Sequence, residues 1–134
     1  KLIKDYLLVN NASSAKFISL LKPKLSINEI KFPFDIVLLG LGADGHFASL
    51  FPGSNIDLND KPDLVVSDKP EGTPSYHRVS MNISMLLNTK RCILLVTNKR
   101  KRMIVNQAFT DNNMPLFFLL NQNKTLIECS DLFK

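Results

Sequence analysis

A buried strand that leads directly into a glycine-rich turn is encoded by Phe34-Asp35-Ile36-Val37-Leu38-Leu39-Gly40-Leu41-Gly42-Ala43-Asp44-Gly45-His46. Its first part, Phe34–Leu39, is almost continuously apolar, which is typical of a parallel strand with both faces covered. The three glycines that follow allow the backbone to turn sharply and to approach a ligand closely. We expect a short helix over His46–Leu50 after this turn, whose free backbone amides would suit an anion.

Further apolar runs alternate with helical patterns along the chain. We expect strands at Asp63–Val66, Arg78–Asn82, Arg91–Val96, Leu116–Leu120 and Thr125–Cys129, and helices at Lys1–Val9, Ile83–Asn88 and Lys99–Phe109. This alternation predicts an α/β fold with a mainly parallel open sheet and helices on both faces. Such sheets bind ligands outside the carboxyl ends of their strands. That rule points to Gly40–His46 and to Thr97–Lys101, where Thr97-Asn98 caps the following helix.

The composition is that of a globular protein. The chain has 134 residues, of which 45% are hydrophobic and 22% charged, which suits one domain and excludes a disordered or fibrous chain. The longest apolar runs are too short to cross a bilayer, and no secretory signal pattern opens the sequence. Two cysteines, Cys92 and Cys129, fit a reducing compartment, so we expect a cytoplasmic protein without a membrane partner. The net charge of +5 would suit an anionic substrate, although a solvated basic surface is the simpler explanation.

Asp44 and His46 lie two residues apart on the glycine-rich turn. A carboxylate beside an imidazole fixes its tautomer and raises its basicity, so the pair suits proton transfer. The turn also matches the pattern GxGxxG, but that match alone is weak, and a tight turn with a surface histidine is the structural alternative. Two cysteines and two histidines at unrelated spacings do not predict a metal site.

A longer string, Phe34–Gly53, resembles the signature of the 6-phosphogluconolactonases. That family shares one sugar-phosphate superfamily with the glucosamine-6-phosphate isomerases and deaminases. The segment Pro74–Ser80 is similar to the family's Pro-x-x-Arg strand, and Leu94–Lys101 is similar to its LLVTGxxK element. The similarity runs from about Asn11 through nearly all of the chain. Phe51 stands where the deaminase branch has a catalytic Glu, which favours the lactonase branch.

The resemblance implies hydrolysis of 6-phosphoglucono-1,5-lactone to 6-phosphogluconate in the pentose phosphate pathway, with no cofactor and no metal. It implies that His46 is the acid/base and that Asp44 orients it. The substrate-binding residues that it implies are Gly40, Gly42, Gly45, Arg78 and Lys101. The glycines would line the sugar site, and the two cations would neutralise the phosphate. A solvated arginine at a strand end is an equally good interpretation of Arg78.

Two other functions stay open. One is a sugar-phosphate isomerase or deaminase of the same superfamily, and the other is an inactive fragment that only binds the sugar phosphate. The family is considerably longer than this chain, so we expect residues 1–134 to be the carboxyl-terminal portion of a single α/β sugar-phosphate hydrolase domain. The expected partner is a small sugar phosphate. A nucleic acid is not expected, because no aromatic platform accompanies the basic run Lys99–Arg102.

Overall fold

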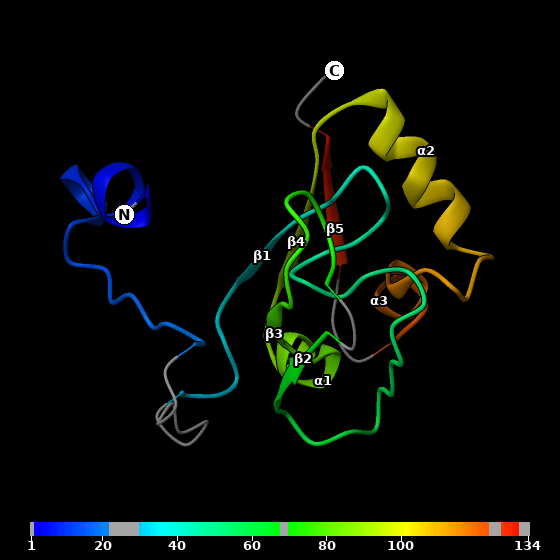
Figure 1. The fold of residues 1–134 in the computed structure, drawn as a ribbon, viewed down its shortest axis with the longest axis horizontal. Helices are drawn as coiled ribbons and strands as arrows, with labels where there is room; N and C mark the ends of the chain where they lie inside the picture. Colours follow the sequence, from blue (N-terminus) through cyan, green and yellow to red (C-terminus); the bar gives the residue numbers. More distant parts are fainter. Residues whose placement is uncertain (1, 22–29, 68–69, 124–126, 132–134) are drawn as a thin grey trace.

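The computed structural model describes residues 2–21, 30–67, 70–123 and 127–131 (Figure 1). Two short helical turns come first, η1 (Ile3–Leu7) and η2 (Asn10–Ala12). The elements that follow are β1 (Val37–Gly40), β2 (Leu64–Val66), β3 (Val79–Met81), α1 (Ile83–Leu87), β4 (Cys92–Val96), α2 (Lys99–Ala108), α3 (Pro115–Leu120) and β5 (Ile127–Asp131).

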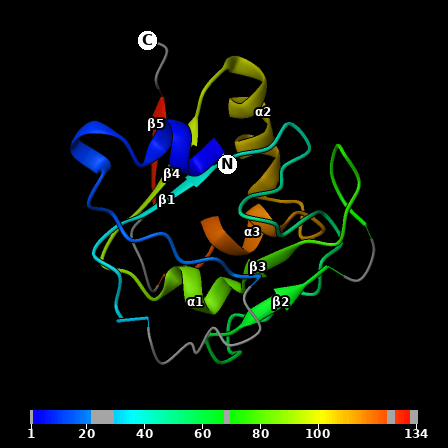
Figure 2. The same ribbon diagram turned by 60° about the vertical axis from the view of Figure 1, so that its left-hand side comes forward.

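The main sheet has three parallel strands in the order β1-β4-β5. The β1–β4 register aligns Val37 with Cys92 and Gly40 with Leu95. A separate antiparallel pair joins β2 to β3. Helices α2 and α3 lie on one side of the main sheet, and η1 lies towards the other side (Figures 1 and 2). The predicted α/β class with a parallel sheet is therefore confirmed.

The core lies between the main sheet and its covering helices. Cys92, Leu94 and Val96 of β4 are buried, whereas the residues between them are half-buried, as the alternation of side chains along a strand requires. Leu116 and Leu119 of α3 are fully buried against this face. The α2 side chains that join them are Ile104, Val105 and Ala108. Within the described residues, no helix is long and apolar enough to span a membrane.

Most expected elements form, with ends shifted by up to three residues. The strands expected at Asp63–Val66 and Arg78–Asn82 appear as β2 and β3, and Asn98 caps α2 by accepting a hydrogen bond from the backbone N–H of Lys101. The last strand is β5, which ends two residues later than expected, and residues 125–126 of the expected strand lie outside the described residues. At the amino end, Ile3–Leu7 forms a π-helical turn rather than the end of an amphipathic helix.

The expected strand at Leu116–Leu120 is wrong, because these residues form helix α3. Pro115 occupies its first turn, where the missing N–H of proline costs nothing. Of the expected strand residues, Leu116 and Leu119 are fully buried, and they are three residues apart, which is a helical rather than a strand spacing.

The expected helix over His46–Leu50 is also wrong. Ala48 has a left-handed backbone with φ of 51°, and the N–H of Leu50 donates to the carbonyl of Phe47 at 2.9 Å. These residues therefore form a tight turn, and no helix amino terminus is available there for an anion.

The second face of the main sheet is apolar but poorly covered. Ile36 and Leu38 are 58% and 61% exposed, whereas the intervening Val37 is half-buried and Leu39 is buried. Beside them, Ile93 and Leu95 of β4 are only half-buried on the same face. The η1 turn buries no side chain of its own, so it leaves this face open.

We predict that residues 1–134 expressed alone bind a hydrophobic dye and unfold without a sharp transition, because contiguous exposed apolar surface is rare on stable monomers. Fluorescence of the bound dye and thermal unfolding would test this. A variant with both Ile36→Lys and Leu38→Lys should bind much less dye. A sharp cooperative transition in a monomer that binds no dye would contradict the prediction.

Candidate functional site

The loop after β1 folds back on itself through short-range hydrogen bonds. The N–H of Gly42 donates to the carbonyl of His46 at 2.7 Å, and the N–H of Gly45 donates to the carbonyl of Gly42 at 3.2 Å. Leu41 and Phe47 form an antiparallel bridge across the base of the loop. This closure places residues 43–45 at the tip and holds Asp44 near His46.

The imidazole and the carboxylate at this tip are in direct contact. Nδ1 of His46 lies 2.5 Å from Oδ1 of Asp44, and the backbone N–H of His46 donates to the same oxygen at 3.2 Å. Burial raises the pKa of Asp44, but the hydrogen bonds from His46 and its charge outweigh that effect and leave the pKa below its ordinary value. The carboxylate is therefore ionised at neutral pH, so it accepts a hydrogen bond from Nδ1–H and leaves Nε2 for other chemistry.

The three glycines of the loop serve different purposes. A Cβ on Gly42 would overlap Nδ1 and Cε1 of His46 and would lie 2.6 Å from Oδ1 of Asp44, so the pair can form only over a glycine. Gly45 has φ of 89°, and a Cβ there would overlap the side chain of Met114. A Cβ on Gly40 would meet nothing within 4 Å in the described part of the chain, so no internal contact requires a glycine there.

A hollow of about 410 Å³ opens at the carboxyl end of β1 and β4. His46, Gly40 and Gly42 line one side of it, and Thr97 and Lys101 line the other. They meet because β1 and β4 are parallel neighbours, which brings their carboxyl ends to the same edge. Lys101 has no ion pair within the described residues, so the hollow combines an imidazole with an available cation.

The structure places Arg78 differently from Lys101. Its guanidinium donates from Nε to the carbonyl of Glu71 at 3.1 Å and from an Nη to the carbonyl of Pro74 at 2.8 Å. It therefore holds the 71–74 loop and does not line the hollow. Arg100, which belongs to the basic run Lys99–Arg102, lines a recess of about 410 Å³ with Asp44 and His46.

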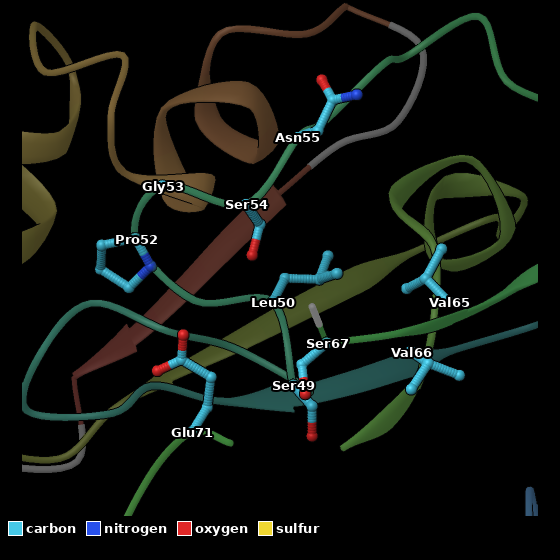
Figure 3. A pocket seen from close by; sticks show the side chains of 10 residues that line it. All are labelled: Ser49, Leu50, Pro52, Gly53, Ser54, Asn55, Val65, Val66, Ser67 and Glu71. Atoms are coloured by element: carbon cyan, nitrogen blue, oxygen red, sulfur yellow. The ribbon is translucent and has the colours of Figure 1, made fainter. Parts of the chain in front are cut away.

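A second hollow, of about 400 Å³, lies beside the segment Ser49–Asn55 and strand β2 (Figure 3). Among the described residues that line it, Glu71 is the one with an ionisable side chain. A carboxylate would repel a phosphate, so an anionic substrate fits the hollow of His46 and Lys101 better. Within the described residues, no cluster of three His, Cys, Asp or Glu side chains could hold a metal ion.

Residues 9–127 match the family described as glucosamine-6-phosphate isomerases/6-phosphogluconolactonase. The chain belongs to this family. It is 36% identical to a 6-phosphogluconolactonase of Helicobacter pylori over 96% of this chain, and 30% identical to one of Caulobacter vibrioides over 94%. The crystal structure of a 6-phosphogluconolactonase from Shewanella baltica superposes with a TM-score of 0.80 at 27% identity and covers 97% of this chain.

The chain spans only part of these members of the isomerase/lactonase family. It covers 61% of the Helicobacter pylori protein, 60% of the Caulobacter vibrioides protein and 62% of the Shewanella baltica chain.

We predict that Gly42→Ala costs about 1–3 kcal/mol of stability, as expected for an added carbon in a filled site. It should also displace the His46 imidazole from Asp44, because the new methyl group would occupy its place. Chemical unfolding and the NMR signals of the histidine ring would measure both effects in the full natural chain.

The matched control is Gly40→Ala, which has open space in the described residues and should change stability by less than about 1 kcal/mol. Equal stabilities and unchanged histidine signals in both variants would show that Gly42 does not support the pair.

Proposed function

We propose that the protein containing this chain hydrolyses 6-phosphoglucono-1,5-lactone to 6-phosphogluconate. The observation that carries this proposal is the His46–Asp44 pair, which lies at a hollow that Lys101 also lines. An acid/base suits hydrolysis of a neutral ester group, and a cation suits binding of a phosphate. Both groups lie at the same edge of the sheet, so a substrate that carries an ester and a phosphate fits the hollow. The similarity to proteins named 6-phosphogluconolactonase supports the same substrate.

His46 would perform the proton transfers. Nε2 takes a proton from water as the water oxygen attacks the lactone carbonyl carbon, and the resulting imidazolium then donates that proton to the ring oxygen as its bond to carbon breaks. Water is consumed and the ring opens to the carboxylic acid. Asp44 holds Nδ1 and stabilises the imidazolium. A lactone carbonyl is already electrophilic, so the proposal needs no metal, cofactor or covalent intermediate.

Lys101 would bind the phosphate, since it lines the hollow without an ion pair in the described residues. Arg78 remains a candidate second cation. Two of the five N–H donors of its guanidinium donate hydrogen bonds to loop carbonyls, and the others can donate to an anion. The backbones of Gly40 and Gly42 would line the sugar ring.

The isomerase or deaminase alternative is less well supported. Residue 51 is a phenylalanine whose ring is stacked on His46, so no carboxylate is available at that position as a further acid or base. A protein that only binds the sugar phosphate would keep Lys101 and the hollow but show no turnover. The cytoplasmic location, and the placement of residues 1–134 within one hydrolase domain, remain predictions.

We expect the full natural chain to consume the lactone faster than its spontaneous hydrolysis, with the same rate in the presence of a chelator. Direct observation of lactone loss by NMR would measure both rates. Turnover of glucosamine 6-phosphate without turnover of the lactone would contradict the proposal, and binding without any turnover would support the binding-only alternative.

His46→Ala should lower the rate by about two to four orders of magnitude, the usual contribution of a positioned acid/base. The control is His77→Ala, because that histidine bonds the carbonyl of Ser67 and does not line the hollow. Equal rates for the two variants would mean that another group activates the water.

A further inference from the structure

One face of the His46 imidazole is covered by the ring of Phe51. The two rings are stacked, with centroids 4.5 Å apart and planes 26° from parallel. Phe51 is 5% exposed, whereas the His46 side chain is 32% exposed. The buried ring of Phe51 therefore covers one face of His46, whose side chain is otherwise partly exposed.

The contact with Asp44 does not by itself fix the plane of the imidazole. That contact holds Nδ1, but the terminal torsion of a histidine side chain is broad, so the ring can tilt about the bond to the carboxylate. A stacked ring on one face removes this freedom. The direction of Nε2 is then set by two contacts, the one at Nδ1 and the one on the ring face.

Phe51 is itself held firmly in the turn. Its backbone N–H donates to Oγ of Ser54 at 3.1 Å, and the N–H of Ser54 donates back to the carbonyl of Phe51 at 2.9 Å. The next residue but one, Gly53, donates its N–H to the carbonyl of Asn113 at 2.9 Å. The ring thus projects from a backbone that is bonded on both sides.

A second support comes from the 71–74 loop. The tip of the Phe51 ring lies 3.6 Å from the position of a Cβ on Gly72, and the Arg78 guanidinium lies 2.8 Å from the same position. Arg78 in turn bonds the carbonyls on either side of Gly72. The tip of the Phe51 ring and the Arg78 guanidinium therefore both lie beside the open side of Gly72, in a loop that Arg78 holds.

An apolar partner at this face has a chemical consequence. A benzene ring offers the imidazole no competing hydrogen bond and keeps water from that face. A carboxylate in the same place would add a negative charge and a second proton acceptor beside His46.

We propose that Phe51 is a positioning residue for His46. Its ring fixes the orientation of the imidazole plane, so that Nε2 points towards the lactone carbonyl. This inference deepens the proposed function and rests on it. Phe51 touches His46 and not the reacting atoms, so its loss should lower kcat and leave KM nearly unchanged.

The test compares Phe51→Leu, Phe51→Tyr and Phe34→Leu in the full natural chain. Phe34 is a half-buried aromatic residue that packs on Phe32 before the amino end of β1, whereas the turn follows its carboxyl end, and it serves as the control. We expect Phe51→Leu to lower kcat about 10- to 100-fold, in the range of a misplaced catalytic group. Phe51→Tyr keeps an aromatic ring at this position and should retain most of the wild-type kcat. Phe34→Leu should change kcat little.

NMR separates this inference from the proposed function. The His46 ring protons should show a through-space contact with Phe51 and an upfield shift from its ring, and both should be lost in Phe51→Leu alone. A wild-type chain that leaves the lactone intact would overturn the proposed function, and the NMR signals would still decide the positioning role. A kcat loss no larger than that of Phe34→Leu, or the absence of the ring contact in the wild type, would overturn the inference even if Phe51→Leu failed to fold.

Discussion

The parallel pairing of β1 with β4 is the constraint on which the site depends. Because Gly40 aligns with Leu95, the turn that carries His46 and the start of α2 that carries Lys101 emerge at the same edge of the sheet. These two residues are 55 positions apart in the chain, and no local interaction could bring them together. The core beneath the sheet, with Leu94 and Leu116 fully buried, keeps this edge in place.

The second constraint is local and concerns space around the acid/base. The Asp44–His46 contact needs a residue without a Cβ at 42, and the imidazole plane needs a ring at 51. The imidazole of His46 therefore has the carboxylate of Asp44 at Nδ1 and the benzene ring of Phe51 on one face. The Arg78 guanidinium contributes from further away by ordering the loop against which Phe51 packs.

Much of this arrangement could be predicted from local sequence signals. The apolar run before Gly40, the second run at Cys92–Val96 and the Asn98 cap are each readable from a few neighbouring residues, and together they place the site at one sheet edge. The run Leu116–Leu120 was misassigned because five apolar residues show no period, and burial at a helical spacing appears only after packing. The stacking of Phe51 on His46 and the bonds of Arg78 to the 71–74 loop depend on how these segments fold in space, which no spacing in the sequence reveals.

The central claim is that Asp44 holds the proton of the His46 ring on Nδ1 and leaves Nε2 as the base. It is tested most directly by ¹⁵N NMR of the neutral imidazole in a His77→Gln variant of the full natural chain. His46 is then the one histidine within residues 1–134. The account predicts a single tautomer with the proton on Nδ1 and an unprotonated Nε2. A ring that carries its proton on Nε2, or that exchanges freely between both tautomers, would contradict it.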